Sequence, residues 1–330
     1  MTGRRYVAID GGNSKTHVVV GTTAGEVLAF VSGPGSSPDH LGIRGSMALL
    51  GRLVAEAVGG AGLPAATVLD QAEVYLAGVD LPVEVESLSG AVGAAGWARR
   101  HRLENDLFAL LRAGTSAADA VAVVCGAGIN CLGRAADGRT ARFPSLGQIS
   151  GDWGGGHHLA EMALWHAARG EDGRGPTTGL TAVVADHFGR STVGEVSAGL
   201  HLGELDRGLL PGLTPALFAV AAAGDAVARR IVTRQAHEVV AMVRVAAGRL
   251  GLTGREFTVV LGGGVLVARH PPLHDVVVEG IHAVAPQARV GVLAEPPVAG
   301  AALLALDALG VKGVEVEAAV RSAIRAALPR

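Results

Sequence analysis

The chain has 330 residues, of which 49% are hydrophobic and only 3% aromatic, and its formal net charge is −2. This length suits two lobes whose cores are built from valine, leucine and alanine. The near-neutral charge gives no general attraction for nucleic acid or an anionic membrane, and few aromatic side chains are present to stack on bases, so neither class of partner is expected.

The apolar runs and the two cysteines bear on where the protein is located. No apolar run typical of a signal peptide opens the chain, and the longer apolar runs are interrupted before the roughly 18 residues of a membrane span. Cys125 and Cys131 do not make a disulfide framework, and no nearby Cys/His pair completes a zinc site. We therefore expect a soluble, cytoplasmic protein.

Three strands joined by turns are predicted at the start of the chain, at 6–10, 17–21 and 27–31. The turn after Asp10 consists of Gly11, Gly12, Asn13, Ser14, Lys15 and Thr16. Because β-branched residues resume directly after it, a second strand is expected rather than the helix of a Walker or dinucleotide site. Consecutive N–H groups in such a turn can bind phosphate, and Asp10 can then face a magnesium ion.

The rest of the first lobe alternates helices and strands up to about residue 115. The sequence predicts a loop at 33–40, helices at 45–58, 82–97 and 107–113, and strands at 74–79 and 102–107. Asp106 lies at the start of the last helix, where capping the helix is the ordinary role of an aspartate. A carboxylate there can also accept a hydroxyl proton during phosphoryl transfer, and these residues alone leave both roles open.

A second lobe repeats the opening pattern about 115 residues later. Strands at 120–125 and 131–134 flank a turn that contains Gly126, Ala127 and Gly128. This turn fails as a dinucleotide motif because a strand, not a helix, follows it. Either turn alone is typical of a hairpin, but two at matching positions of a duplicated pattern suggest that together they bind a polyphosphate.

Helices dominate the remainder of the chain. They are predicted at 155–169, 178–188, 215–250 with a break near residue 224, 273–284 and 298–309, with strands at 256–261 and 289–293 and an amphipathic tail at 311–330. Asp152 lies in a glycine-rich stretch before the first of these helices, which suggests close approach of a ligand, although helix capping is the simpler role. Gly262, Gly263 and Gly264 form a sharp turn after a buried strand, a place where nucleotide bases are often held.

The order of these motifs resembles that of the N-acetylglucosamine kinase and BadF/BadG/BcrA/BcrD-type ATPase family, within the sugar kinase, Hsp70 and actin superfamily. The matching segments are 9–16, 105–111, 125–131, 147–156, 261–264 and 296–302, and the resemblance covers roughly residues 5–309. It implies an α/β fold of two duplicated ribonuclease H-like lobes, the actin-like ATPase fold, with an active-site cleft between the lobes. The lobes are expected at 1–115 and 116–310, followed by a tail at 311–330.

The resemblance also implies roles for individual residues. It implies ATP and Mg²⁺ as cofactors, a sugar phosphorylated at its 6-hydroxyl, Asp106 as the base and Asp10 as the residue that organises Mg²⁺. The implied sugar-binding residues are Asp39, His40, Asn105, Asn130 and Asp152. The implied nucleotide-binding residues are Gly11, Gly12, Asn13, Ser14, Lys15, Thr16, Gly126, Ala127, Gly128, Gly262, Gly263 and Gly264. A homodimer is a further expectation.

The sequence departs from the family pattern in two places. The second phosphate turn has Ala127 and Ile129 where the family has hydroxyl side chains, so side-chain contacts to phosphate are expected mainly from the first turn. Asp39 stands where relatives often have asparagine, which favours glucosamine as an alternative to N-acetylglucosamine.

Two other functions stay open. One is a BadF-type ATPase that activates a partner enzyme, and the other is a non-catalytic sugar sensor. The two cysteines lie inside the phosphate motif instead of in the widely spaced arrangement that holds an iron–sulfur cluster, which argues against the activator.

Overall fold

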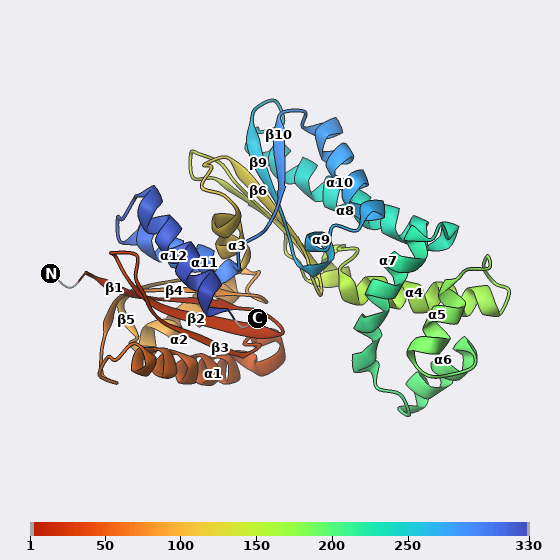
Figure 1. Ribbon diagram of the computed structural model, residues 1–330, viewed down its shortest axis with the longest axis horizontal. Coiled ribbons are helices and arrows are strands. Elements are labelled where there is room, and N and C mark those ends of the chain that lie inside the picture. The colour runs from red at the N-terminus through yellow and green to blue at the C-terminus, as the bar shows by residue number, and fades with distance from the viewer. Residues whose placement is uncertain (1–2, 329–330) are drawn as a thin grey trace. The chain divides into compact units, whose positions relative to one another are not determined.

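The computed structural model describes residues 3–328, which form two compact units (Figure 1). The first unit comprises residues 3–118 and 293–328, and the second comprises residues 119–292. The division expected after residue 115 lies close to the observed one, but residues 293–310 and the tail belong to the first unit, not to the second lobe or to a separate segment. The reason is packing, because α11 (Pro297–Ala308) lies on the first sheet and against α3 (Leu107–Gly114).

The first unit is built on a five-stranded mixed sheet. Its strands are β1 (Arg5–Gly11), β2 (Lys15–Thr22), β3 (Val27–Pro34), β4 (Leu69–Leu76) and β5 (Ala98–Asn105), in the order β3-β2-β1-β4-β5. β2 is antiparallel to β1 and β3, whereas β4 and β5 run parallel to β1. The carboxyl ends of β1, β4 and β5 therefore meet at one edge, where Gly11 pairs with Leu76 and Leu76 with Asn105.

Helices cover both faces of this sheet (Figure 1). α1 (Pro38–Gly60) and α2 (Pro82–Ala95) cover one face, and α3, α11 and α12 (Val314–Ala327) cover the other. Because side chains alternate along a strand, Val7 and Ile9 of β1 join the first core, and Tyr6 and Ala8 join the second.

The second unit repeats the same sheet topology. Its strands are β6 (Ala120–Cys125), β7 (Ile129–Arg134), β8 (Thr140–Arg142), β9 (Phe257–Gly262) and β10 (Ala288–Val292), in the order β10-β9-β6-β7-β8. With β6 to β10 as the counterparts of β1 to β5, both the order and the strand directions match. The predicted duplication, and with it the predicted α/β fold of two related lobes, is confirmed.

The helices of the second unit agree with the sequence except at four elements of ten residues or fewer. They are η1 (Gly147–Ser150), α4 (Gly156–Glu171), α5 (Leu180–His187), α6 (Val193–Leu202), η2 (Arg207–Gly212), α7 (Leu213–Ala222), α8 (Ala226–Leu250), α9 (Gly264–Val267) and α10 (Pro271–Val284). The predicted break near residue 224 is confirmed, because Asp225 caps α8 by accepting hydrogen bonds from the N–H groups of Val227 and Ala228. The sequence did not predict η1, α6, η2 and α9. Of these, α6 contains glycine and is supported by burial of Val193 and Val196.

Within residues 3–328, no single helix is long and apolar enough to cross a membrane. The segments 207–222 and 226–250 reach that length and composition only when taken together, and they are bent by 111°. Both contribute buried side chains to the core of the second unit.

Candidate functional site

The turn between β1 and β2 leaves backbone N–H groups available to a ligand. The N–H of Gly12 closes the turn by donating to the carbonyl of Lys15 at 2.8 Å. The N–H groups of Asn13 and Ser14 have no protein acceptor in the part of the chain that the structure describes. The side chains of Ser14 and Lys15 are exposed. Two free N–H groups beside a hydroxyl and an ammonium group fit an anion such as phosphate.

Thr16 supports this turn from within the fold. Its side chain is fully buried, and Oγ1 lies 2.8 Å from both the carbonyl oxygen of Pro34 and Oγ of Ser36. The N–H of Ser36 in turn donates to the carbonyl of Gly12 at 3.1 Å. The Thr16 hydroxyl is therefore engaged inside the protein, and the nucleotide-binding role of Thr16 stays a prediction that its backbone would have to fulfil.

Asp10 and Asp106 come together at the carboxyl ends of the parallel strands. The pKa of Asp10 is raised to about 7, first by burial and then by the charge of Asp106, against a lowering effect of Lys15. The pKa of Asp106 is raised to about 6 by burial, against a smaller lowering effect of nearby backbone N–H groups. This electrostatic coupling means that the predicted base, the predicted magnesium residue and the lysine of the turn share one site.

Helix capping is the ordinary role of an aspartate at this position, but the Asp106 side chain makes no capping hydrogen bond to α3. The N–H of Leu107 instead donates to Oδ1 of Asn105 at 3.0 Å, and Nδ2 of Asn105 donates to Asp80 at 3.0 Å. Asn105 is 3% exposed and uses both ends of its amide within the protein. It therefore supports the neighbouring carboxylate, although the sequence suggested that it contacts the sugar.

Asp39 and His40 lie in the first turn of α1, not in the predicted loop, because Ser37 caps the helix by accepting the N–H of Asp39 at 3.4 Å. The Asp39 carboxylate packs on Gly78, where a Cβ atom would collide with Oδ2. Gly78 follows β4, so Asp39 lies near the same edge of the sheet as Asp106. Burial raises the pKa of Asp39, and the charge of Glu84 raises it further.

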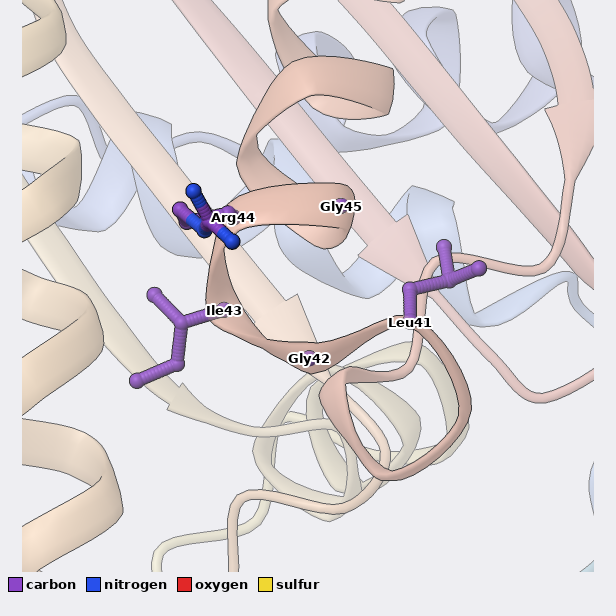
Figure 2. A pocket seen from close by; sticks show the side chains of 5 residues that line it. All are labelled: Leu41, Gly42, Ile43, Arg44 and Gly45. Carbon is purple, nitrogen blue, oxygen red and sulfur yellow. The ribbon is translucent and has the colours of Figure 1, made fainter.

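An open hollow of about 620 Å³ directly follows these two residues in α1 (Figure 2). It is lined by residues 41–45, and Gly42, with φ 63° and ψ 167°, interrupts the helix there. Leu41 and Ile43 point to opposite sides of this interruption in Figure 2, and both are exposed. Together with Arg44, they offer apolar and cationic surface beside the residues predicted to contact a sugar.

The glycine turn of the second unit mirrors the first. The N–H of Gly126 donates to the carbonyl of Gly128 at 2.9 Å, and among residues 3–328 the N–H groups of Ala127 and Gly128 have no protein acceptor. The start of α4 packs on this turn, since the N–H of Gly156 donates to the carbonyl of Gly126 at 2.7 Å. At Gly155, with φ +86°, a Cβ atom would lie 2.5 Å from Cα of Gly128. Only glycine permits this close approach.

A cavity of about 320 Å³ extends from this turn within the second unit. Part of its lining is backbone, at Gly126, Ala127, Gly156 and Gly264. The remaining lining residues are His157, Pro211, Thr214, Pro215, Phe218, Val265, Ala268 and His270. The rings of Phe218 and His270 stack with centroids 4.3 Å apart and planes 7° apart. A pocket of this volume, with apolar walls and a glycine turn at its margin, fits a nucleoside bearing phosphates.

The predicted glycine corner after β9 forms part of this pocket. Gly262 ends β9, and Gly263, with φ +81°, lies so close to the carbonyl of Cys125 that a Cβ atom would collide with it. Gly264 then begins α9 and lines the cavity. Sequence reasoning missed the side chains of Phe218 and His270, because no local motif marks residues that are brought together from α7 and the segment before α10.

Asn130 and Asp152 form a second group, because both belong to the second unit, whereas the other predicted sugar-binding residues belong to the first. Asn130 is 9% exposed, and its Oδ1 accepts the N–H of Cys131 at 2.7 Å. Asp152 accepts hydrogen bonds from the N–H of Gly147 at 3.0 Å and from Oγ of Ser150 at 2.6 Å. The Asn130 side chain thus binds the backbone of its own strand β7, and the Asp152 carboxylate stabilises the turn at η1.

The donor set suits magnesium better than a transition metal. Within residues 3–328, no three His, Cys, Asp or Glu side chains are grouped to hold a metal ion. Mg²⁺ needs no such group, because it is usually held by one or two carboxylates, water and the phosphates of the substrate. Asp10, with Asp106 nearby, supplies oxygen donors of this kind.

Comparison with known proteins gives the same family as the motifs. The sequence matches the family described as the BadF/BadG/BcrA/BcrD ATPase family over residues 7–305. It is 25% identical to the N-acetylmuramic acid/N-acetylglucosamine kinase of Clostridium acetobutylicum over 263 residues, which covers 79% of this chain and 85% of the relative. It is 26% identical to the N-acetyl-D-glucosamine kinase of Dictyostelium discoideum over 320 residues, covering 92% and 98% of the two chains.

The fold is also shared with solved structures. A candidate N-acetylglucosamine kinase from Chromobacterium violaceum superimposes with a TM-score of 0.70 at 22% identity, covering 92% of this chain and 99% of the other. At this identity the likeness concerns the fold alone, and it agrees with the duplicated α/β architecture described above.

Proposed function

Because the chain belongs to the BadF/BadG/BcrA/BcrD ATPase family, we propose that it is a kinase that transfers the γ-phosphate of ATP to the 6-hydroxyl of an amino sugar. One observation carries the proposal: two turns at equivalent positions of duplicated sheets each leave two N–H groups free for phosphate. The second turn borders a pocket of nucleoside size. The names of the two curated relatives support a sugar as the acceptor.

Separate residues are proposed to bind the nucleoside, to bind the phosphates and to accept the proton of the sugar hydroxyl. The nucleoside occupies the pocket beside Phe218 and His270, and the phosphates bind the backbone N–H groups of the turns, with Lys15 adding positive charge. Asp10 would hold Mg²⁺, and the ion would supply positive charge to the phosphate oxygens. Asp106 orients the sugar hydroxyl and accepts its proton as the bond between that oxygen and phosphorus forms and ADP leaves. With a pKa of about 6, its carboxylate is largely ionised near neutral pH and can accept a proton.

N-acetylglucosamine is the proposed acceptor, and glucosamine is the alternative that Asp39 favours. The carboxylate of Asp39 could pair with the ammonium group of a free amino sugar, whereas an acetamido group carries no charge. Turnover of the two sugars by the wild type and by Asp39→Asn distinguishes them. If Asp39 selects glucosamine, the substitution should lower turnover of glucosamine far more than turnover of N-acetylglucosamine. A clear wild-type preference for the acetylated sugar would argue against this role of Asp39.

The activator function receives less support from the structure. Cys125 is 0% and Cys131 1% exposed, and burial raises the pKa of both thiols. Buried, protonated thiols in the two strands that flank the second glycine turn are poor ligands for a cluster at a protein surface.

A coupled assay of ADP release over a panel of hexoses and amino sugars tests the proposal. Asp106→Asn should lower kcat by about 10²- to 10⁴-fold with little change in the KM for ATP. Asp137→Asn is a matched control, because Asp137 lies exposed in a hairpin of the second unit, where it pairs with Arg139. If no sugar stimulates ATP turnover, or if Asp106→Asn remains fully active, the kinase assignment with this base fails.

A further inference from the structure

The helix that carries Asp106 is short and depends on its neighbours. α3 has eight residues, and a helix of that length is unstable alone because nucleation is unfavourable. Its amino end is attached to the sheet, since the N–H of Asp106 donates to the carbonyl of Leu76 at 3.2 Å. Its last carbonyl groups have no partner within the helix. The position of the Asp106 carboxylate therefore depends on what holds the other end of α3.

Arg112, near the carboxyl end of α3, is 5% exposed and bound to two carboxylates. Its Nε donates to Asp307 of α11 at 2.9 Å. Its terminal nitrogens donate to Glu317 of α12 at 3.1 and 2.5 Å. A buried guanidinium group needs such partners, because an unpaired charge in the interior is strongly destabilising.

Arg321 of α12 supplies the donors that the end of α3 lacks. Its guanidinium group donates to the carbonyl of Ala113 at 2.7 Å and to the carbonyl of Arg112 at 3.3 Å. Val320 and Ile324 hold α12 in place, since both are fully buried in the core beneath it. α12 thus binds α3 through two side chains. Glu317 pairs with the side chain of Arg112, and Arg321 donates to the backbone at the end of α3.

We propose that α12 is a clamp that positions Asp106, with Arg112, Glu317 and Arg321 as positioning residues. The inference rests on the proposed function, because it takes Asp106 as the base. α12 begins after residue 305, where the match to the family ends, so the clamp is built by a segment outside the family match. Small displacements of a catalytic group are sufficient to lower kcat strongly.

The test compares Arg321→Met with Arg325→Met. Arg325 lies one turn further along α12 and pairs at 2.7 Å with Glu295, so its loss leaves the contacts to α3 in place. Measurements are kcat, the KM for ATP and for N-acetylglucosamine, and hydrogen exchange of residues 107–114, at a temperature where circular dichroism shows each variant folded. Arg321→Met should lower kcat about tenfold to a hundredfold, leave the KM for ATP unchanged and accelerate exchange in 107–114. Arg325→Met should match the wild type, and Arg321→Lys, which retains a donor, should recover part of the lost kcat.

A kcat for Arg321→Met within about twofold of the wild type would overturn the clamp, even if exchange became faster, because the contacts would then be structural only. An equal loss of kcat in Arg325→Met would overturn it as well. A wild-type protein that phosphorylates no sugar would instead refute the proposed function. Unchanged protection of residues 107–114 in Arg321→Met would refute the support of α3 by α12, whether or not a sugar is phosphorylated.

Discussion

Asp106 combines a position at the end of a parallel strand with a carboxyl group that holds its proton more tightly than an ordinary aspartate. Burial raises its pKa to about 6. Below that pH the group is protonated and cannot accept a proton from a sugar hydroxyl. Asp10, whose pKa is about 7, is also protonated in this range and then lacks the charge that would hold Mg²⁺. We predict that kcat falls at least about tenfold per pH unit below about 6. A profile of kcat at saturating substrates between about pH 5 and 8 measures this, and a rate that stays constant down to pH 5 would contradict it.

Glu73 is a buried carboxyl group that the proposed reaction does not use. It is 1% exposed, and its oxygens accept hydrogen bonds from Tyr75 at 2.6 Å and from Gln71 at 2.9 Å. Burial raises its pKa, while these hydrogen bonds and the charge of Arg102 lower it in part. An acid whose pKa is higher in the folded state stabilises that state when protonated, and this contribution is lost as the pH rises through the folded pKa.

This linkage predicts a pH-dependent effect of Glu73→Gln. Between about pH 7 and 5, the wild type should gain free energy of unfolding relative to the variant, because only the wild type takes up a proton at this position. Urea denaturation of the wild type and of Glu73→Gln at pH 7 and pH 5 gives the difference between their free energies of unfolding at each pH. A difference that does not change with pH would mean that Glu73 keeps the same protonation state on folding.

Among the elements, the two glycine turns bind phosphate in our proposal through backbone rather than side chains, so their shape matters most. Gly155→Ala should displace the turn that carries Gly128, because the new Cβ atom would lie 2.5 Å from the Cα atom of Gly128 and φ is +86°. We predict that the Kd for ATP rises at least about tenfold, as measured by calorimetry.

Gly248→Ala is the matched control for this prediction. Gly248 lies within α8 of the same unit, and a Cβ atom there would meet nothing within 4 Å. ATP binding should be unchanged, and stability should rise by up to about 1 kcal/mol because alanine favours helix. Equal losses of ATP binding in both variants would show that the turn geometry is not the cause.

Two elements begin earlier than the sequence predicted, because their first residues lack the pattern of apolar side chains that marks a strand or a helix. β5 begins at Ala98, whereas the sequence predicted a strand only from residue 102. Arg99, Arg100 and His101 are exposed on this edge strand, so no alternation of apolar side chains marks them. Likewise, Pro38 to Leu41 form a capped helical turn, although proline and glycine nearby favoured a loop.

At the scale of the whole molecule, the order of the segments along the chain determines which unit can be produced as a single fragment. The second unit is one continuous segment, 119–292, between two segments of the first. We predict that the fragment 119–292 folds and binds ATP, because the lining of the pocket proposed for the nucleoside lies entirely within it. Circular dichroism and calorimetry on the purified fragment check this, and an unfolded fragment would contradict it.

The fragment 116–310, which follows the boundaries expected from sequence, is the comparison. It includes α11 without β1 and α3, so the almost entirely buried face of that helix would be exposed. It should therefore aggregate or elute as large species in size-exclusion chromatography. Better solution behaviour of 116–310 than of 119–292 would show that α11 stabilises the second unit.

The sequence by itself determined the duplicated strand–turn–strand pattern, the fold class and the family, because glycine turns and β-branched runs are properties of contiguous residues. It also predicted a role in phosphoryl transfer for Asp10, Asp106 and the two turns. Only the tertiary structure decided which side chains are available there, since it buries the hydroxyl of Thr16 and the amide of Asn105. It alone assembled the pocket in which we propose that the nucleoside binds, and it alone joined α12 to α3. Those arrangements depend on contacts between residues far apart in the chain, such as Arg112 with Glu317, which no local pattern encodes.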